Sequence, residues 1–385
     1  MPTVCIIGAG YAGIHAARTA RATGADVVLV EPTGNHDLAP RLAGVAAGRR
    51  DVGDAWAPLE DIVDATVIRA RATRVDEEGP VVHLDDGRTL TPDTVVVTVG
   101  AESSLPPIDG LDAQTATTLK TSADALALRE AIPGRDRLVI VGAGATGVQL
   151  AAEAALAHPD LDVHVVEATD EVLGAFDPTL GRRATQILRD RGVTVHLDAA
   201  VARAEDDAVV LGNGTRLEGL VVWATGVAAD ANTLLPGART VDGRLFVDRH
   251  LRITGKVLAA GDVAAHRDLL GRVTAQSAQI ALQAGRAAGR NAALIAQHRA
   301  PKRATLVDLG WVVDMGGRGV AQVGPVEVAL PLVDLLIPAL HEAIDLRHLW
   351  QAGGARAVLG HATGRHTPST AEVRRAERPT LRSVG

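Results

Sequence analysis

The feature that most constrains the fold is a glycine-rich loop set between an apolar strand and an alanine-rich helix. In residues 3–22, Gly8, Gly10 and Gly13 form the pattern G-x-G-x-x-G. The first glycine permits a tight turn, the second lets the backbone approach a pyrophosphate, and the third lets the helix pack on the strand. The helix start supplies N–H groups and partial positive charge for phosphate. The next apolar strand ends in Glu31, whose carboxylate can accept hydrogen bonds from ribose hydroxyls, so a dinucleotide site is predicted.

The same arrangement returns in the middle of the chain. LVIVGAGATGVQLAAEAA carries Gly142, Gly144 and Gly147, and the following strand ends in Glu167. Residues 81–100 are echoed by 208–226, each a hairpin with Asp-Gly or Asn-Gly at its turn and then a strand that runs into glycine. The chain is therefore predicted to hold two nucleotide-binding units of similar build.

Two dinucleotide sites indicate two different cofactors. FAD with a nicotinamide is the economical combination, because a flavin accepts a hydride and releases electrons singly or in pairs. Glu167 would repel a 2′-phosphate, and the following Ala-Thr-Asp-Glu contains no arginine to bind one. NADH is therefore favoured over NADPH.

Composition excludes several other classes of protein. The formal net charge of -7 argues against a surface that binds nucleic acid. Cys5 is the single cysteine, which excludes an intramolecular disulfide and a CxxC redox pair and favours a cytoplasmic location. We expect Cys5 to be a packed small hydrophobe. The N-terminus lacks a basic leader, and no apolar run is long enough for a membrane span, so neither a signal peptide nor a spanning helix is expected, and no metal site is predicted.

The two loops, together with Val222-Trp223-Ala224-Thr225-Gly226 and with Gly261-Asp262 in LAAGDVAA, resemble the two-dinucleotide flavoprotein family. NHDLAPRLAGVAAG (35–48) makes the chain most similar to the type II NADH dehydrogenases, which are single-chain NADH:quinone oxidoreductases. The resemblance implies an α/β fold with two Rossmann-like domains. The FAD-binding domain would comprise 1–110 and 228–300, with an NAD(H)-binding domain, 111–227, inserted in it. Residues 301–385 would form a C-terminal region with a mobile basic tail.

The resemblance also implies site residues. Asp262 would bind the flavin ribityl chain, and a helix beginning near Thr274 would point its positive end at the flavin pyrimidine. NADH would pass a hydride to flavin N5. The residues expected to bind FAD are Gly8, Gly10, Tyr11, Ala12, Gly13, Glu31, Pro32, Arg41, Gly100, Gly261, Asp262, Ala275 and Gln276. The residues expected to bind NAD are Gly142, Gly144, Thr146, Gly147, Glu167, Thr225 and Gly226.

The route by which electrons leave departs from the family pattern. Ala275-Gln276 matches an Ala-Gln pair of the quinone site, but the later Gln-Gln pair falls on Ile280-Ala281. Gln149 stands where the family has a glutamate near the nicotinamide, and Glu153 follows one turn later. Gln276, Gln149 and Glu153 are therefore the candidate catalytic residues, with a quinone or another small molecule as acceptor. A ferredoxin-type reductase, a secondary-metabolism flavin oxidase and a slow redox sensor stay as alternatives.

The same helix carries two further glutamines. Gln279 could share the face of Gln276, whereas Gln283 is predicted to be structural.

An apolar segment, 329–350, lies near the C-terminus. Leu332, Leu335, Leu336, Ala339, Leu340 and Ile344 fall on one helical stripe, and Pro338 is expected to kink the helix. The stripe is expected to pack on the core or in a homodimer. The alternative is peripheral contact with the inner face of the cell membrane, which the acids Asp334, Glu342 and Asp345 disfavour on anionic lipid.

Overall fold

The fold is built on two parallel sheets. The computed structural model describes residues 1–76, 78–112, 114–229, 233–269, 271–323, 326–328, 336–363, 368 and 372–373. The larger sheet has the strand order β21-β22-β9-β1-β2-β5, with only β21 antiparallel to its neighbour. Its strands are β1 (Thr3–Ile7), β2 (Asp26–Val30), β5 (Thr66–Ile68), β9 (Thr94–Val97), β21 (Arg252–Thr254) and β22 (Val257–Ala259). Strands from residues 3–97 and from residues 252–259 therefore form one sheet.

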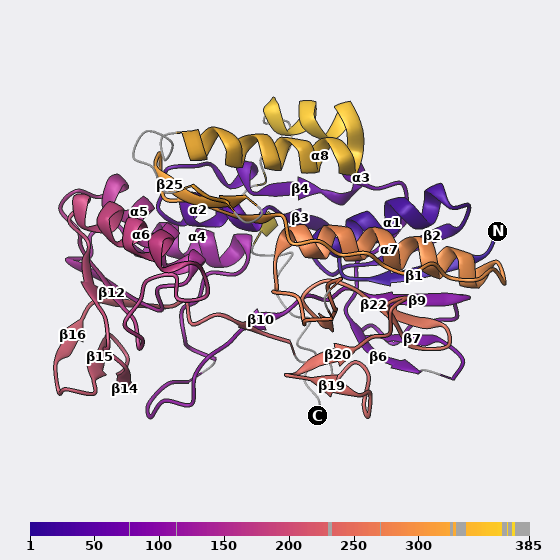
Figure 1. Cartoon of the computed structure of the whole chain (residues 1–385), viewed down its shortest axis with the longest axis horizontal. Coiled ribbons are helices and arrows are strands. Elements are labelled where there is room, and N and C mark those ends of the chain that lie inside the picture. The colour runs from indigo at the N-terminus through magenta and orange to yellow at the C-terminus, as the bar shows by residue number, and fades with distance from the viewer. Residues whose placement is uncertain are drawn as a thin grey trace.

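The second sheet repeats this design with the order β13-β12-β11-β17, all parallel. Its strands are β11 (Arg137–Val141), β12 (Asp162–Val166), β13 (Thr194–His196) and β17 (Leu220–Trp223). In both sheets the central strand is almost wholly buried, as expected where helices cover both faces. Helices α4 (Ser122–Ala131), α5 (Ala145–Ala157) and α6 (Pro178–Asp190) belong to this second unit (Figure 1).

The internal repeat predicted from the sequence is confirmed. Each unit carries a small antiparallel sheet, β6-β7-β8 in the first and β14-β15-β16 in the second. Their strands are β6 (Ala72–Asp76), β7 (Val81–Leu84), β8 (Thr89–Leu90), β14 (Val201–Glu205), β15 (Ala208–Leu211) and β16 (Arg216–Glu218). The chain passes between the units through β10 (Glu102–Ser103) and β18 (Val227–Ala228), which pair antiparallel.

Two helices that are distant in sequence, α1 (Tyr11–Ala22) and α7 (Ala278–Ala296), lie side by side against the larger sheet (Figure 1). Small residues allow the contact: a Cβ on Gly285 would lie 2.1 Å from the Ala12 carbonyl oxygen, and one on Gly289 would lie 2.1 Å from that of Ala16. Close packing of this kind holds the start of α7 beside the first glycine loop.

The remaining elements are short. They are β3 (Asn35–Asp37), η1 (Ala39–Arg41), α2 (Leu42–Ala46), η2 (Val52–Asp54), β4 (Trp56–Pro58), α3 (Leu59–Ile62), β19 (Thr240–Val241), β20 (Arg244–Phe246), β23 (Ala264–Ala265), β24 (Gly310–Asp314), β25 (Gly319–Val323) and β26 (Val326–Val328).

The C-terminal helix α8 (Ile337–Ala362) lies across the outside of the molecule, in yellow at the top of Figure 1. It contacts α3, β24 and β25. Pro338 lies in its first turn, where proline is tolerated, so the expected kink there is wrong. The helix instead breaks at Gly354, whose φ is 65°.

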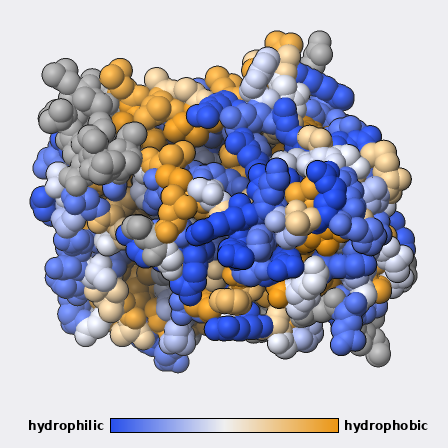
Figure 2. Space-filling model, turned by 45° about the vertical axis from the view of Figure 1, so that its right-hand side comes forward, coloured by the Kyte–Doolittle hydropathy of each residue, from blue (hydrophilic) through white to orange (hydrophobic). Residues whose placement is uncertain are grey.

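The apolar stripe of α8 faces outward, which corrects the expectation that it packs on the core. Leu336, Leu340 and Ile344 are 63%, 40% and 45% exposed, whereas the opposite side of the helix buries His341, Asp345 and His348. Apolar side chains gather along the upper part of the face seen in Figure 2, the level at which α8 lies. Leu332, Leu335, Asp334 and the basic end of the tail fall outside the described residues.

Candidate functional site

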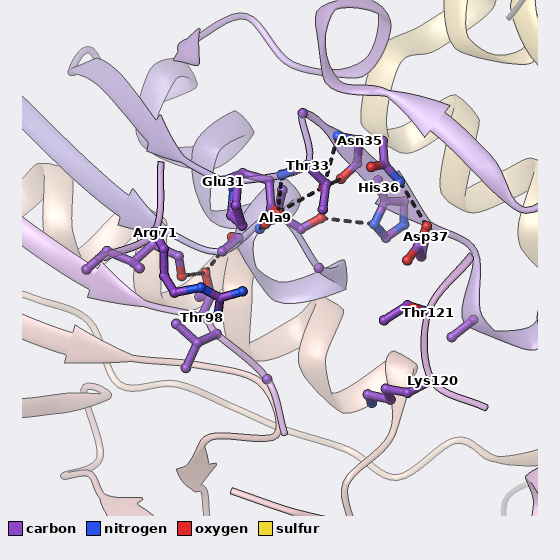
Figure 3. Close-up of a pocket in the computed structure, with 18 of the residues that line it drawn as sticks. Ala9, Glu31, Thr33, Asn35, His36, Asp37, Arg71, Thr98, Lys120 and Thr121 are labelled. Atoms are coloured by element: carbon purple, nitrogen blue, oxygen red, sulfur yellow. Dashed lines mark hydrogen bonds between the residues drawn. The ribbon is translucent and has the colours of Figure 1, made fainter. Parts of the chain in front are cut away.

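A cavity of about 1430 Å³ opens at the carboxyl ends of β1, β2 and β9 (Figure 3). Ligands of open α/β sheets bind at this edge. The predicted FAD residues that line the cavity are Gly8, Gly10, Tyr11, Ala12, Glu31, Pro32, Gly100, Gly261 and Asp262. The structure therefore brings segments about 250 residues apart to one site.

Each glycine of the first loop meets a different spatial constraint. A Cβ on Gly8 (φ 97°) would lie 2.6 Å from the Thr98 carbonyl oxygen, and one on Gly13 would lie 1.9 Å from that of Gly8. A Cβ on Gly10 would meet nothing within 4 Å, because this residue borders the cavity. Two glycines thus allow close packing, and the third leaves backbone accessible to a ligand.

Glu31 lines the cavity and also holds the first glycine loop in place by hydrogen bonds. Its Oε2 accepts a hydrogen bond from the Ala9 N–H at 2.9 Å. Its Oε1 accepts from the N–H and hydroxyl of Thr33 at 3.1 and 2.9 Å (Figure 3). A carboxylate has about four lone-pair sites, so capacity for ribose hydroxyls remains.

The second loop reproduces this geometry. The Ala143 N–H donates to Glu167 Oε2 at 2.9 Å, and Thr169 donates through its N–H and hydroxyl to Oε1 at 2.9 and 3.0 Å. A Cβ on Gly142 would lie 2.4 Å from the Ala224 carbonyl oxygen, and Gly144 is open like Gly10. The bracing threonine was not predicted, although a threonine two residues after each acid is visible in both sequence repeats.

The other predicted residues of the second unit lie around this loop. Gly147 packs against Gly142, and Thr146 is exposed in the first turn of α5. The Thr225 hydroxyl donates to the Ser104 carbonyl, and the Ser104 N–H donates to the Gly226 carbonyl at 2.9 Å. Thr225 and Gly226 therefore also fasten the second unit to the segment that enters it.

Arg41 does not line the cavity, contrary to its predicted contact with FAD. Its guanidinium pairs with Asp345 at 2.7 Å and Glu342 at 2.8 Å, both on α8. This pairing could not be predicted from the sequence, because the partners lie more than 300 residues away.

The wall formed by 261–281 differs in detail from the expectation. Helix α7 begins at Ala278, after the N-cap Ser277, and not near Thr274. Ala275 is exposed, and neither it nor Gln276 lines the cavity. The Gln276 amide donates to the Asp262 carbonyl at 3.2 Å, which holds this wall in place.

Asp262 lies in an electrostatically mixed environment. Burial raises the pKa of its carboxyl, and the positive charges of Lys120 and Arg244 act in the opposite direction. Lys120 lines the cavity (Figure 3), although sequence reasoning missed it. The one feature of the sequence that could have indicated Lys120 is that the chain has only three lysines.

The other two candidate catalytic residues lie on α5. Glu153 is 8% exposed and forms an ion pair of 2.5 Å with Arg49. Gln149, one turn earlier, is partly buried. The structure therefore gives Glu153 a fixed cationic partner that the sequence did not reveal.

Gln279 and Gln283 fasten the segment 304–310 to α7. The Gln279 amide donates to Asp308 and to the Gly310 carbonyl at 2.6 and 2.8 Å. Gln283 exchanges two hydrogen bonds with the main chain of Val307, at 2.8 and 3.0 Å. The structural role predicted for Gln283 is confirmed, and Gln279 has the same role.

Cys5 is fully buried in β1, and burial raises the pKa of its thiol to about 12, so the prediction of a packed, unreactive side chain is confirmed. Among the described residues, no group of three or more His, Cys, Asp or Glu side chains could hold a metal ion. No helix within the described ranges combines the length and apolar character needed to cross a membrane.

Two acid-braced glycine loops on two parallel sheets define a class of α/β oxidoreductases that use two dinucleotides. Within this class, the chain belongs to the pyridine nucleotide-disulphide oxidoreductase family, which matches residues 2–285. Both the suspected family and the expected fold class are thereby confirmed.

Individual relatives of the chain are also named as NADH dehydrogenase-like proteins or NADH:quinone oxidoreductases. An NADH dehydrogenase-like protein of Mycobacterium tuberculosis is 31% identical over 350 residues, 80% of this chain and 86% of that protein. A type II NADH:quinone oxidoreductase of Staphylococcus aureus is 25% identical over 390 residues, 91% of this chain and 96% of that protein. The expected assignment to the NADH dehydrogenase-like enzymes is confirmed.

Solved structures share the fold. NDH2 from Plasmodium falciparum, solved with NADH, superposes with a TM-score of 0.77 over 96% of this chain and 100% of that chain, at 16% identity. A putidaredoxin reductase, solved in a covalent complex with putidaredoxin, gives 0.72 over 84% of this chain and 81% of that chain, at 24% identity.

Proposed function

We propose that the chain is an FAD-dependent NADH dehydrogenase that binds FAD at the first glycine loop and NADH at the second. The observation that carries this proposal is the repetition of one geometry, in which an acid at a strand end holds a loop N–H at 2.9 Å in both units. We assign FAD to residues 1–110 and 228–300, NADH to 111–227, and a separate contact role to 301–385.

The cavity fits the pyrophosphate and ribose of FAD. Gly10 leaves backbone open to the cavity, and the start of α1 supplies N–H groups and partial positive charge for phosphate. Glu31 has lone pairs for ribose hydroxyls, and Asp262, which also lines the cavity, offers a carboxylate for the ribityl hydroxyls. When bound, FAD supplies an acceptor for the hydride of NADH and a donor of electrons to a second substrate.

The side chains around the site hold and orient the substrates. Positioning two reactants is worth several kcal/mol by itself. We propose that Gln149 faces the nicotinamide and that Glu153, fixed by Arg49, keeps this face of α5 in place. Gln276 supports the Asp262 wall. With one cysteine in the chain, no dithiol can relay electrons.

We propose NADH as the donor in preference to NADPH. The Glu167 carboxylate occupies the end of β12, where it would repel a 2′-phosphate. The residues that follow, 168–171, include no arginine that could bind that phosphate.

A quinone is the acceptor we favour, because several relatives carry the name type II NADH:quinone oxidoreductase. The orientation of α8 supports contact with the membrane, where quinones dissolve. Of the acids that disfavoured this contact, Asp345 is buried against Arg41, and Glu342 also pairs with Arg41 although its side chain stays 40% exposed. The outward side presents Leu336, Leu340, Ile344 and Trp350, a composition typical of interfacial helices.

Anaerobic addition of NADH to the purified protein tests the proposed function. Bleaching of bound flavin within seconds is expected, followed by rapid reoxidation with a menaquinone analogue. Reoxidation by a ferredoxin or by oxygen, with quinones inactive, would establish a reductase or an oxidase instead. A long-lived reduced state with every acceptor would establish a sensor, and a folded protein that binds no flavin would refute the proposal.

A further inference from the structure

Three buried histidines from three separate elements form one line of hydrogen bonds. His15 Nε2 lies 3.2 Å from His348 Nδ1, and His348 Nε2 lies 3.0 Å from His36 Nε2. His36 Nδ1 lies 3.0 Å from the Ala9 carbonyl oxygen (Figure 3), and the Arg286 Nε lies 3.3 Å from His15 Nδ1 at the other end. None of the three histidines is more than 3% exposed. The line therefore runs from α7 through α1, α8 and β3 to the first glycine loop.

The direction of every bond in this line follows from its two ends. Arg286 can only donate, so His15 Nδ1 accepts. A neutral imidazole has one N–H, so His15 must donate to His348, His348 to His36, and His36 to the Ala9 carbonyl. Burial agrees with neutral rings, since it lowers the pKa of His15 to about 3, of His36 to about 4 and of His348 to about 2. A carbonyl oxygen cannot pass a proton on, so the line serves to orient groups and not to conduct protons.

The group that it orients is the peptide between Ala9 and Gly10. A trans peptide is planar, so a carbonyl directed at His36 sends the Gly10 N–H in the opposite direction. Gly10 borders the cavity with open space around it. The preceding peptide is fixed as well, because the Ala9 N–H donates to Glu31. The phosphate-facing backbone is thus held from two sides.

The second loop provides an internal comparison. Its equivalent carbonyl, on Ala143, accepts a hydrogen bond of 2.9 Å from the main-chain N–H of Leu173. The first loop therefore relies on side chains for a contact that the second loop makes with its own neighbouring backbone. One of those side chains, His348, comes from the C-terminal helix.

We propose that His15, His36 and His348 are positioning residues of the first glycine loop, so that retention of FAD depends on the hydrogen bonds that His348 makes from α8, while binding of NAD⁺ does not. This inference rests on the proposed function. Tyr11 strengthens the coupling, because its ring lines the cavity and lies 4.5 Å from the ring of His348.

Substitution of His348 tests the inference. His348→Leu removes both hydrogen bonds at similar size, whereas His348→Gln keeps one neutral donor and one acceptor. In the Leu variant the Kd for FAD is expected to rise about tenfold, the scale of one lost buried hydrogen bond. The Gln variant should stay within about threefold of the unaltered protein. The Kd for NAD⁺ should be the same in all three, and the ³¹P resonances of bound FAD should shift only in the Leu variant.

Two control variants separate this role from simple packing of α8. Leu349→Ala loosens the buried side of the helix without touching the histidines, and Trp350→Ser alters its exposed side. If Leu349→Ala weakens FAD binding as much as His348→Leu does at an equal loss of Tm, the inference is overturned. It is also overturned if His348→Leu binds FAD normally. Failure of the unaltered full-length protein to bind FAD would refute the proposed function and the inference together.

Discussion

The guanidinium of Arg41 lies 2.7 Å from the carboxylate of Asp345, and their side chains are only 3% and 4% exposed. This ion pair joins the segment after the first acid to the C-terminal helix, 304 residues later. It explains why a helix with an apolar outer stripe docks through its polar side.

Breaking the buried pair should loosen α8. Arg41→Met leaves the Asp345 carboxylate buried without its cation, which costs about 3–5 kcal/mol. We expect urea unfolding to show this loss and limited proteolysis to cut first within residues 336–363. The double variant Arg41→Met with Asp345→Leu should recover part of the stability. The control Arg21→Ala, at an ion pair with 41% and 84% exposed side chains, should lose far less stability, because water screens exposed charges. Equal losses at both sites would contradict the prediction.

Mild acid should destabilise the fold. His15, His36, His348 and His266 have folded pKa values of about 3, 4, 2 and 3, lowered by burial. Unfolded histidine titrates near pH 6.5, so between about pH 6.5 and 4 the unfolded chain binds more protons, and stability falls as pH falls.

Buried carboxyls with raised pKa values change the stability in the opposite direction over the same pH range. Burial raises the pKa of Asp37 to about 6, and also raises the pKa of Asp124 and Asp262. The four histidines should outweigh them, so that the free energy of unfolding still decreases as the pH falls. The urea concentration at the midpoint of unfolding, measured between pH 8 and 4.5, tests this decrease. The decrease should be smaller in the His348→Gln variant. A midpoint independent of pH would refute the prediction.

Lys120 should tune the flavin that we propose for the cavity. It is the ammonium that lines this site, and its charge acts on Asp262. A nearby cation stabilises negative charge on a reduced flavin. Lys120→Met should lower the two-electron reduction potential by about 30 mV, equivalent to about 1.4 kcal/mol. Dye equilibration measures this, with the exposed Lys256→Met as the control. A shift shared by both variants would exclude a local effect.

The outer stripe of α8 should bind lipid. Leu340→Ser with Ile344→Ser removes two exposed apolar side chains from one face. We expect the double variant to sediment at least tenfold less with anionic vesicles, because each apolar group buried in lipid contributes about 1.5–3 kcal/mol. Leu269→Ser, at an apolar side chain that is 58% exposed and not part of α8, is the matched control. A different result would refute lipid binding: the wild-type protein does not sediment with vesicles, but it forms a dimer that the α8 substitutions weaken. The stripe would then contact a second copy of the chain.

Much of the fold and of the cofactor cavity could be predicted because glycine loops act through the backbone. Gly8, Gly10 and Gly13 occupy fixed places in a strand-loop-helix unit, and Glu31 follows at the end of the next strand. These relations are local, so the spacing of residues along the chain specifies them. The internal repeat could be recognised for the same reason.

Contacts between distant residues could not be predicted in this way. Periodicity found the stripe on α8 but could not tell which side of the helix faces the body. The amides of Gln279 and Gln283 could equally have faced a ligand until the segment 304–310 was seen to cover them.

The sequence by itself determined two dinucleotide units, their acids and the absence of a redox dithiol, because spacing and residue type specify local backbone geometry. Only the tertiary structure decided that three histidines link the C-terminal helix to the first loop and that Arg41 links it to the segment after Glu31. Their partners lie up to 333 residues apart, and which of many polar side chains meet in the interior depends on how the whole chain packs.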